Sequence, residues 1–287
     1  MGVNKDDIVY HYCSVDAFLN IIQNSRLWLS DILKSNDNKE CTWIKDMINS
    51  EIESRLAEID SNALKAWKFG YQLRADIGND MTVYTCCFSE CYDSLSQWRG
   101  YAQDGQGVAI GFSKMHLQAL NGKLPYHFIF NKVVYEEKEQ EKFIDNIVKE
   151  NFENMQFKGI GHVGLELGSN YLLRFPLYKN PNFNEEKEWR IVFLSRPGSK
   201  RINGDVEGFQ FLDTKFRSGD GKIVSYLEMD FSNIKHKFVK EICIGPKSKV
   251  SKIDVQNVLL ASGYYDMGKT YDYNEPIHIT TSKSSYR

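Results

Sequence analysis

IVYHYCSVDAFLNIIQNSRLWLS, at residues 8–30, decides how the fold begins. Residues 8–12 have the apolar and aromatic composition of a strand. Ser14 can cap the helix that follows, because apolar side chains recur there at helical spacing up to residue 24. Residues 26–30 alternate polar and apolar side chains, as a half-buried strand does. A strand, a helix and a second strand are therefore expected to open the protein.

Strands and helices remain interleaved further along the chain. A helical insertion at about 40–78 and a Gly-rich polar surface excursion at about 197–222 interrupt them. No internal repeat, Pro-rich linker or change of composition marks a boundary, so residues 1–287 are expected to form one α+β domain. The expected strands are 82–88, 108–112, 132–135, 189–194 and 238–244, and the expected later helices are 44–59, 93–101, 136–157 and 251–263.

Composition excludes several classes of protein. With 42% hydrophobic and 13% aromatic residues, the chain can build a substantial core. The net charge of −2 provides no global field for coating a nucleic acid. No apolar run reaches the roughly 18 residues of a membrane span, and residues 1–7 lack the pattern of a signal peptide. A cytoplasmic protein without membrane contact is expected, with its six cysteines mostly as small buried hydrophobes.

Two familiar ligand motifs are not supported. Gly105-x-Gly107-x-x-x-Gly111 follows a helix and runs into a strand, whereas a phosphate-binding loop needs a strand followed by a helix N-terminus. A zinc site usually needs two closely spaced pairs of ligands. Cys87 and Cys91 are the first such pair, but the sequence has no second pair, and its histidines are scattered. No metal site is therefore expected.

Polar and aromatic side chains at a few positions have both a structural and a functional interpretation. His11 lies in an apolar strand, either as a satisfied core residue or as a ligand contact. Glu188 immediately precedes an apolar strand, with Glu186 on the same side by period two. Such carboxylates are either a solvated strand end or groups that stabilise positive charge or activate a hydroxyl. Trp98 and Tyr101 share one helix face, as core or as a stacking platform.

Five fragments in order carry a resemblance to a known family. They are the stretch at 9–30, SNDNKE at 35–40, CCFSECYDSLSQWRGYAQDGQGVAIGF at 86–112, KNPNFNEEKEWRI at 179–191 and EICIGP at 241–246. Together they resemble the bacterial family known as domain of unknown function 2971. Their order is also similar to the ADP-ribosyltransferase fold of the histidine, tyrosine, glutamate type. The resemblance implies a split β-sheet core with flanking helices.

The resemblance also implies roles for individual residues and NAD as co-substrate. It implies that His11 donates a hydrogen bond to a ribose hydroxyl of NAD, and that Glu188 holds the 2′-hydroxyl of the nicotinamide ribose. Tyr101 or Trp98 would stack on nicotinamide, and Glu186 is a second acid. Arg99 and Arg190 either receive the pyrophosphate or pair with the glutamates. The catalytic set is Glu188, His11 and Tyr101, and the NAD-binding set is His11, Tyr12, Trp98, Arg99, Tyr101, Glu186 and Arg190.

The expected function is that of a mono-ADP-ribosyltransferase, as a bacterial toxin or anti-phage defence effector. Its acceptor is a nucleic-acid base or a protein side chain, and a cognate antitoxin or regulator is a candidate partner. One alternative is a metal-dependent nuclease, because Asp37 with Glu185-x-Lys187 echoes a D…E-x-K pattern. Another is a nucleotide-binding module without turnover. Asn36 and Asp37 either cap the next helix or approach the ligand.

Overall fold

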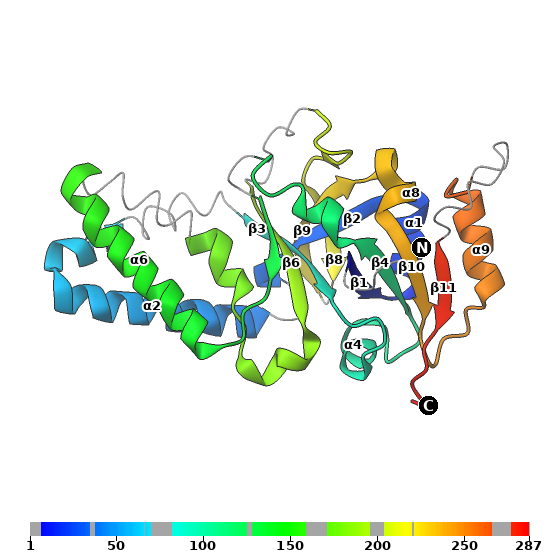
Figure 1. Ribbon diagram of the computed structural model, residues 1–287, viewed down its shortest axis with the longest axis horizontal. Helices are drawn as coiled ribbons and strands as arrows, with labels where there is room; N and C mark the ends of the chain where they lie inside the picture. Colours follow the sequence, from blue (N-terminus) through cyan, green and yellow to red (C-terminus); the bar gives the residue numbers. More distant parts are fainter. Residues whose placement is uncertain are drawn as a thin grey trace.

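The computed structural model describes residues 7–34, 38–65, 67–69, 82–124, 128–158, 171–195, 204–219, 221–265 and 277–286 (Figure 1). Its strands are β1 Ile8–Cys13, β2 Arg26–Asp31, β3 Thr82–Ser89, β4 Val108–Ser113, β5 Phe128–Lys132, β6 Glu188–Ser195, β7 Gln210–Phe211, β8 Lys215–Gly219, β9 Lys222–Asp230, β10 Val239–Ile244 and β11 His278–Thr281. Its named α-helices are α1 Val15–Asn24, α2 Asn38–Ile59, α4 Leu95–Tyr101, α5 Lys114–Gln118, α6 Glu137–Lys158, α8 Lys235–Phe238 and α9 Lys252–Ala261. Short 3-10 helices are η2 Ile32–Lys34, η3 Phe175–Leu177, η4 Pro181–Glu186 and η5 Ser232–Ile234.

One mixed sheet forms the centre of the fold. It divides at β3, where two strands, β1 and β2, share the same edge of that strand. The strand order is β11-β10-β4-β1-β3-β2-β9-β7, with β6 paired to β3 and β5, and β8 paired to β9. β6 pairs with the whole of β3. On the other edge, β1 pairs with β3 only at Tyr10 and Ser89, and β2 pairs only at the opposite end, at Thr85 and Tyr84. Two branches of the sheet therefore separate beside residues 86–88.

Helix α1 joins the two branches, and its ends follow the sequence signals. The Ser14 hydroxyl accepts a hydrogen bond from the Ala17 amide at 3.1 Å, and Ser25 ends the helix in the left-handed region at φ 51°. The apolar face of α1 packs on the sheet with Val9 and Phe112, in the largest core cluster. A mixed α and β architecture around a central open sheet is thus confirmed.

A second core cluster holds α2 and α6 against the sheet. The two helices lie side by side and extend away from β3 and β6 (Figure 1). Ile52 of α2 and Ile147 of α6 are buried with Val192 of β6. The predicted insertion at about 40–78 is therefore helical over its described part, while residues 70–81 lie outside the described residues. No helix in the described ranges is long and apolar enough to cross a membrane.

Two segments differ in detail from the expected strands. The predicted surface excursion contains β7 and β8, with tight turns at glycines before β7 and after β8, and Phe209 within it is fully buried. Residues 197–203 and 220 of that excursion lie outside the described residues. The strand predicted at 132–135 lies earlier in the chain, at Phe128–Lys132, because these are the residues that pair with β6. β9 and β11 were not expected.

Gly107 allows two backbone segments to approach one another. A Cβ on Gly107 would lie 2.0 Å from the Cys13 carbonyl oxygen, which no rotamer change can relieve. Its own carbonyl accepts a hydrogen bond from the Gly245 amide at 3.0 Å. The glycines that suggest a nucleotide loop therefore serve backbone packing between β1, β4 and β10.

We predict that Gly107→Ala lowers the free energy of unfolding by at least about 2 kcal/mol, since the new methyl group meets backbone and must displace a strand. Gly100→Ala is the control, because Gly100 lies in α4 with no atom near the position of the added carbon. It is expected to be neutral or slightly stabilising. Equal urea midpoints for the two variants would contradict the described packing.

Candidate functional site

His11 lies where β1 separates from β3. Its Nδ1 is 2.9 Å from the backbone carbonyl oxygen of Cys87, and its ring is 5.9 Å from that of Phe88. A carbonyl only accepts hydrogen bonds, so Nδ1 carries the hydrogen and Nε2 is the acceptor of the neutral ring. Burial lowers the pKa of His11, and the bond to Cys87 opposes this only partly. The ring is therefore neutral at pH 7.

Glu188 is placed by the turn that begins β6. Lys187 adopts a left-handed conformation at φ 43° and ends η4, so that the strand starts at Glu188. The backbone N–H of Glu188 donates to the Tyr135 hydroxyl at 3.2 Å. In register, Glu188 lies opposite Ser89, which lies opposite Tyr10. Partners in register share a face, so these three side chains point to one side of the sheet.

Two carboxylates and two cations form a buried network around Glu188. Arg190 Nε donates to Glu188 Oε1 and its terminal nitrogen donates to Oε2, both at 2.8 Å. Lys179 Nζ lies 2.6 Å from Glu186 Oε2 and 3.5 Å from Glu188 Oε2. The four residues are between 2% and 8% exposed. Burial raises the pKa of Glu188, but Arg190 and Lys179 outweigh it and the net shift is downward, so the carboxylate is ionised.

Cys87 connects His11 with Glu188. Its carbonyl binds the His11 ring, and its thiol hydrogen-bonds the Glu188 carboxylate, which helps to lower the pKa of that acid. Cys87 is half-buried, whereas Glu188 is 5% exposed. Cys87 thus contacts both groups, the imidazole through its backbone and the carboxylate through its side chain. His11 follows Tyr10 in β1, so its side chain points to the face of the sheet opposite to Tyr10 and Glu188.

The predicted aromatic residues lie on the other side of β1 from His11. Tyr12 and Trp98 belong to a separate core cluster with Tyr10, while Phe88, beside His11, belongs to the main cluster. Trp98 is fully buried, and its indole N–H donates to Asp93 at 2.7 Å. Of the two interpretations of Trp98, core describes its position. Tyr12 is also buried, and its hydroxyl donates to the Cys91 carbonyl at 2.7 Å.

The remaining predicted residues divide between the surface and the buried network. Tyr101 is half-buried against the cluster of Trp98, and Arg99 is exposed, with its guanidinium 5.9 Å from the centre of the Tyr286 ring. Arg190 pairs with Glu188 and donates to the Pro176 carbonyl at 2.7 Å. Of the two interpretations of Arg190, pairing with the glutamates therefore describes its contacts. Glu186 is held by Lys179.

Lys179 and Cys87 were missed by the sequence interpretation. Lys179 opens the fragment KNPNFNEEKEWRI, and a lysine among apolar neighbours so close to several glutamates could have signalled a buried pair. Cys87 alternates with Ser89 along β3, so period two could have placed it on the face of Glu188.

The nuclease alternative lacks its expected geometry. Glu185 and Lys187 are exposed and precede β6, whereas the pattern needs them inside a strand. Asn36 and Asp37 lie outside the described residues. Within the described ranges, no group of three or more His, Cys, Asp or Glu side chains could hold a metal ion.

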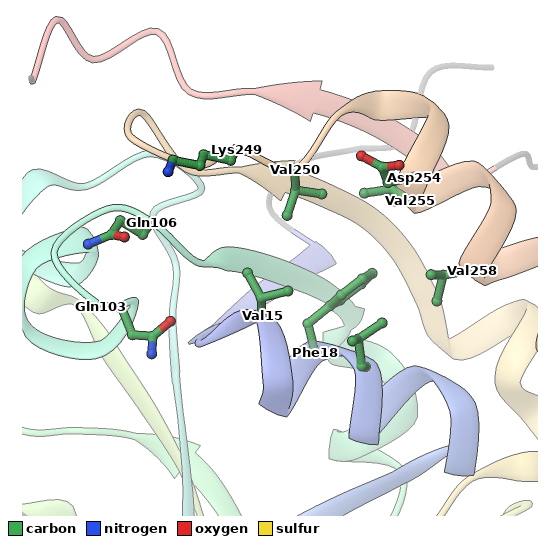
Figure 2. A pocket seen from close by; sticks show the side chains of 10 residues that line it. Val15, Phe18, Gln103, Gln106, Lys249, Val250, Asp254, Val255 and Val258 are labelled. Atoms are coloured by element: carbon green, nitrogen blue, oxygen red, sulfur yellow. The ribbon is translucent and has the colours of Figure 1, made fainter.

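A surface groove lies elsewhere. A groove of about 440 Å³ runs between α1, the loop after α4 and the start of α9 (Figure 2). None of the predicted site residues lines it. The buried network is the better candidate for chemistry, because it holds an ionised acid whose neighbour Cys87 also binds the neutral His11, whereas the groove is mainly apolar.

Comparison with known protein families gives a match over part of the chain. Residues 97–191 match a family described as "Protein of unknown function (DUF2971)". The matched segment extends from α4 into β6 and contains Lys179, Glu186, Glu188 and Arg190. This match supports the family expected from the sequence. No curated protein and no solved structure matches the chain.

We predict a strong energetic coupling between Arg190 and Glu188. Arg190→Met leaves a buried carboxylate short of its bidentate partner and should lower the free energy of unfolding by about 3–5 kcal/mol. Adding Glu188→Gln removes that charge and should recover part of the loss, as measured in a double-mutant cycle by urea unfolding. Lys142→Met, which removes an exposed ion pair with Glu139, should not change the midpoint measurably. Additive effects of the Arg190 and Glu188 substitutions would contradict the network.

Proposed function

We propose that this protein is an NAD-dependent mono-ADP-ribosyltransferase, acting as a bacterial toxin or anti-phage defence effector. One observation carries the proposal: a neutral His11 and an ionised Glu188 both bind Cys87 where the sheet divides. The order of histidine strand, aromatic helix and glutamate strand, which resembles ADP-ribosyltransferases, adds to it.

Transfer of ADP-ribose from NAD requires a carboxylate that stays ionised. Loss of neutral nicotinamide from NAD leaves an oxocarbenium ion on the ribose. Glu188 stabilises that positive charge electrostatically and holds the ribose 2′-hydroxyl. Because the pKa of Glu188 is lowered, the group is negative throughout the neutral pH range. Arg190 and Cys87 fix the orientation of the carboxylate, so that little reorganisation is needed when charge develops.

His11 and Tyr101 act as binding groups in this proposal. His11 uses its Nδ1 hydrogen on Cys87, so Nε2 contacts a ribose hydroxyl as an acceptor while the ring is neutral. This differs from the donor role that the resemblance implies. Tyr101, half-buried on the helix that carries Trp98, is the aromatic residue that we assign to nicotinamide. This assignment places the nicotinamide on the face of Tyr10 and Glu188 and leaves His11 to reach the ribose from the other side of β1. Tyr101 packs against the cluster that contains Trp98 and Tyr12, whose ring centres are 4.7 Å apart.

Arg99 is the cation that we assign to the pyrophosphate of NAD. It is exposed at the end of α4, whereas the guanidinium of Arg190 is fully engaged inside the protein. The acceptor of ADP-ribose is a nucleic-acid base or a protein side chain, and a cognate antitoxin or regulator would act on the same protein. The exposed edge at half-buried Cys87 is where we place the ribose.

A second candidate is a nucleotide-binding module without turnover. It is favoured by the burial of Glu188, because both carboxylate oxygens are occupied by Arg190 and the residue is only 5% exposed. A carboxylate in this state can serve stability alone. The two functions differ in whether nicotinamide is released.

We predict that the purified protein, incubated with labelled NAD and cell extract, releases nicotinamide and labels macromolecules, with and without EDTA. Glu188→Gln should lower both signals by about 10²–10³-fold, since it removes the charge opposite the oxocarbenium ion. Glu185→Gln is the matched control, because Glu185 is exposed and lies three residues away in sequence. It should keep full activity.

Three outcomes separate the candidates. Nicotinamide release that depends on Glu188 but not on EDTA supports transfer. NAD binding in calorimetry without release, in extracts from several sources, supports the binding module. An equal loss in Glu185→Gln and Glu188→Gln, or intact and unbound NAD throughout, sinks the transferase proposal.

A further inference from the structure

The groove between α1 and α9 has a fixed polar end. The loop after α4 and the loop before α9 are joined by hydrogen bonds from the Gly245 amide to the Gly107 carbonyl at 3.0 Å and from the Lys247 amide to the Gly105 carbonyl at 2.9 Å. A Cβ on Gly245 would lie 2.4 Å from the Gly105 carbonyl oxygen, so the two loops touch through their backbones. This end of the groove is therefore formed before any ligand binds.

Three polar side chains extend from these loops into the same end. Figure 2 shows Gln103, Gln106 and Lys249 together there, on the two joined loops. None of the three makes a side-chain hydrogen bond or ion pair with another described residue. All three are exposed. They offer a positive charge and two amides to a ligand group with acceptor oxygens.

The rest of the groove is an apolar trough. Val15 and Phe18 line it from α1, and Val255 and Val258 line it from α9 (Figure 2). Val15 and Val258 are only half-buried, so the trough presents apolar surface to solvent. Its volume of about 440 Å³ falls in the range of about 300–1,000 Å³ found for small-molecule sites.

The one acidic residue of the lining is fixed in the cap of α9. Asp254 accepts hydrogen bonds from the amide and hydroxyl of Ser251, at 2.8 and 2.6 Å, as part of the capping box of α9. These bonds lower the pKa of Asp254, so its carboxylate stays negatively charged and is fixed in the cap, on α9 and not on the loops that carry Lys249 (Figure 2). The groove therefore joins the positive charge of Lys249 at one end to a mainly apolar body.

We propose that this groove is a binding site for a small amphipathic carboxylate, with the carboxylate at Lys249, Gln103 and Gln106 and the hydrocarbon chain between α1 and α9. Charge complementarity selects an anion over a cation of the same chain length. The contact of the chain with Val15 and Val258 supplies the hydrophobic part of the affinity. The site is independent of the network around Glu188.

The test uses two probes of equal chain length and opposite charge, decanoate and decyltrimethylammonium, each titrated below its micelle concentration by calorimetry. Decanoate is expected to bind at one saturable site, at least tenfold more tightly than the cation. Lys249→Glu should weaken decanoate binding at least tenfold and improve binding of the cation. Lys252→Glu is the matched control, since Lys252 is exposed at the start of α9 and does not line the groove. It should change either affinity less than twofold.

Filling the trough provides a second, independent test. Val258→Trp and Val15→Trp approach the groove from opposite walls, and each should abolish decanoate binding while the circular dichroism spectrum is retained. One folded variant of the two is sufficient. Non-saturable binding, equal effects of the two lysine substitutions, or unchanged affinity in a folded tryptophan variant would overturn the proposal.

Discussion

A backbone carbonyl at a sheet edge needs a hydrogen-bond donor, and at Cys87 the His11 side chain supplies it. β1 leaves β3 after a single paired position, and β2 joins β3 only near its start. The His11 ring takes the place of a strand amide and binds the Cys87 carbonyl at 2.9 Å. The divergence of the two branches is thus stabilised by one side chain. The same contact fixes which nitrogen of His11 carries the hydrogen.

The buried ion network depends on this frame. Because β6 pairs with all of β3, Glu188 and Arg190 are held on the face that Cys87 and Ser89 share. Their charges are costly to bury alone, and they persist because Arg190 and Lys179 balance Glu188 and Glu186. An acid kept ionised within a protein interior suits the stabilisation of a developing cation, and it also suits a fixed structural pair. The difference between the two lies in access for a ligand.

Local patterns in the sequence predict the regular elements well and the site only in part. β1, α1 and β2 follow from alternation and from the Ser14 cap, because these signals act over a few residues. β7 and β8 were missed since their short runs lie between glycines that read as a loop. The sequence allows Arg190 either to pair with the glutamates or to bind the pyrophosphate, because it does not show where the guanidinium points.

Two features of the site geometry have a signal in the sequence. His11 and Tyr12 are adjacent in a strand, so period two places their side chains on opposite faces. Trp98 follows Asp93 by five residues, and a partner for its N–H nearby favours a buried indole over an exposed one. What local patterns cannot supply is the single pairing of β1 with β3, because it depends on contacts between residues about eighty positions apart.

The central claim is most directly tested by nitrogen-15 NMR of the His11 ring across a pH titration. The account predicts a neutral ring with hydrogen on Nδ1 and a pKa below the ordinary value for histidine, because burial disfavours the charged form. The two ring nitrogens then differ strongly in chemical shift at pH 7. A hydrogen on Nε2, or a ring that is still charged at pH 7, would contradict the bond to Cys87 on which the divided sheet depends.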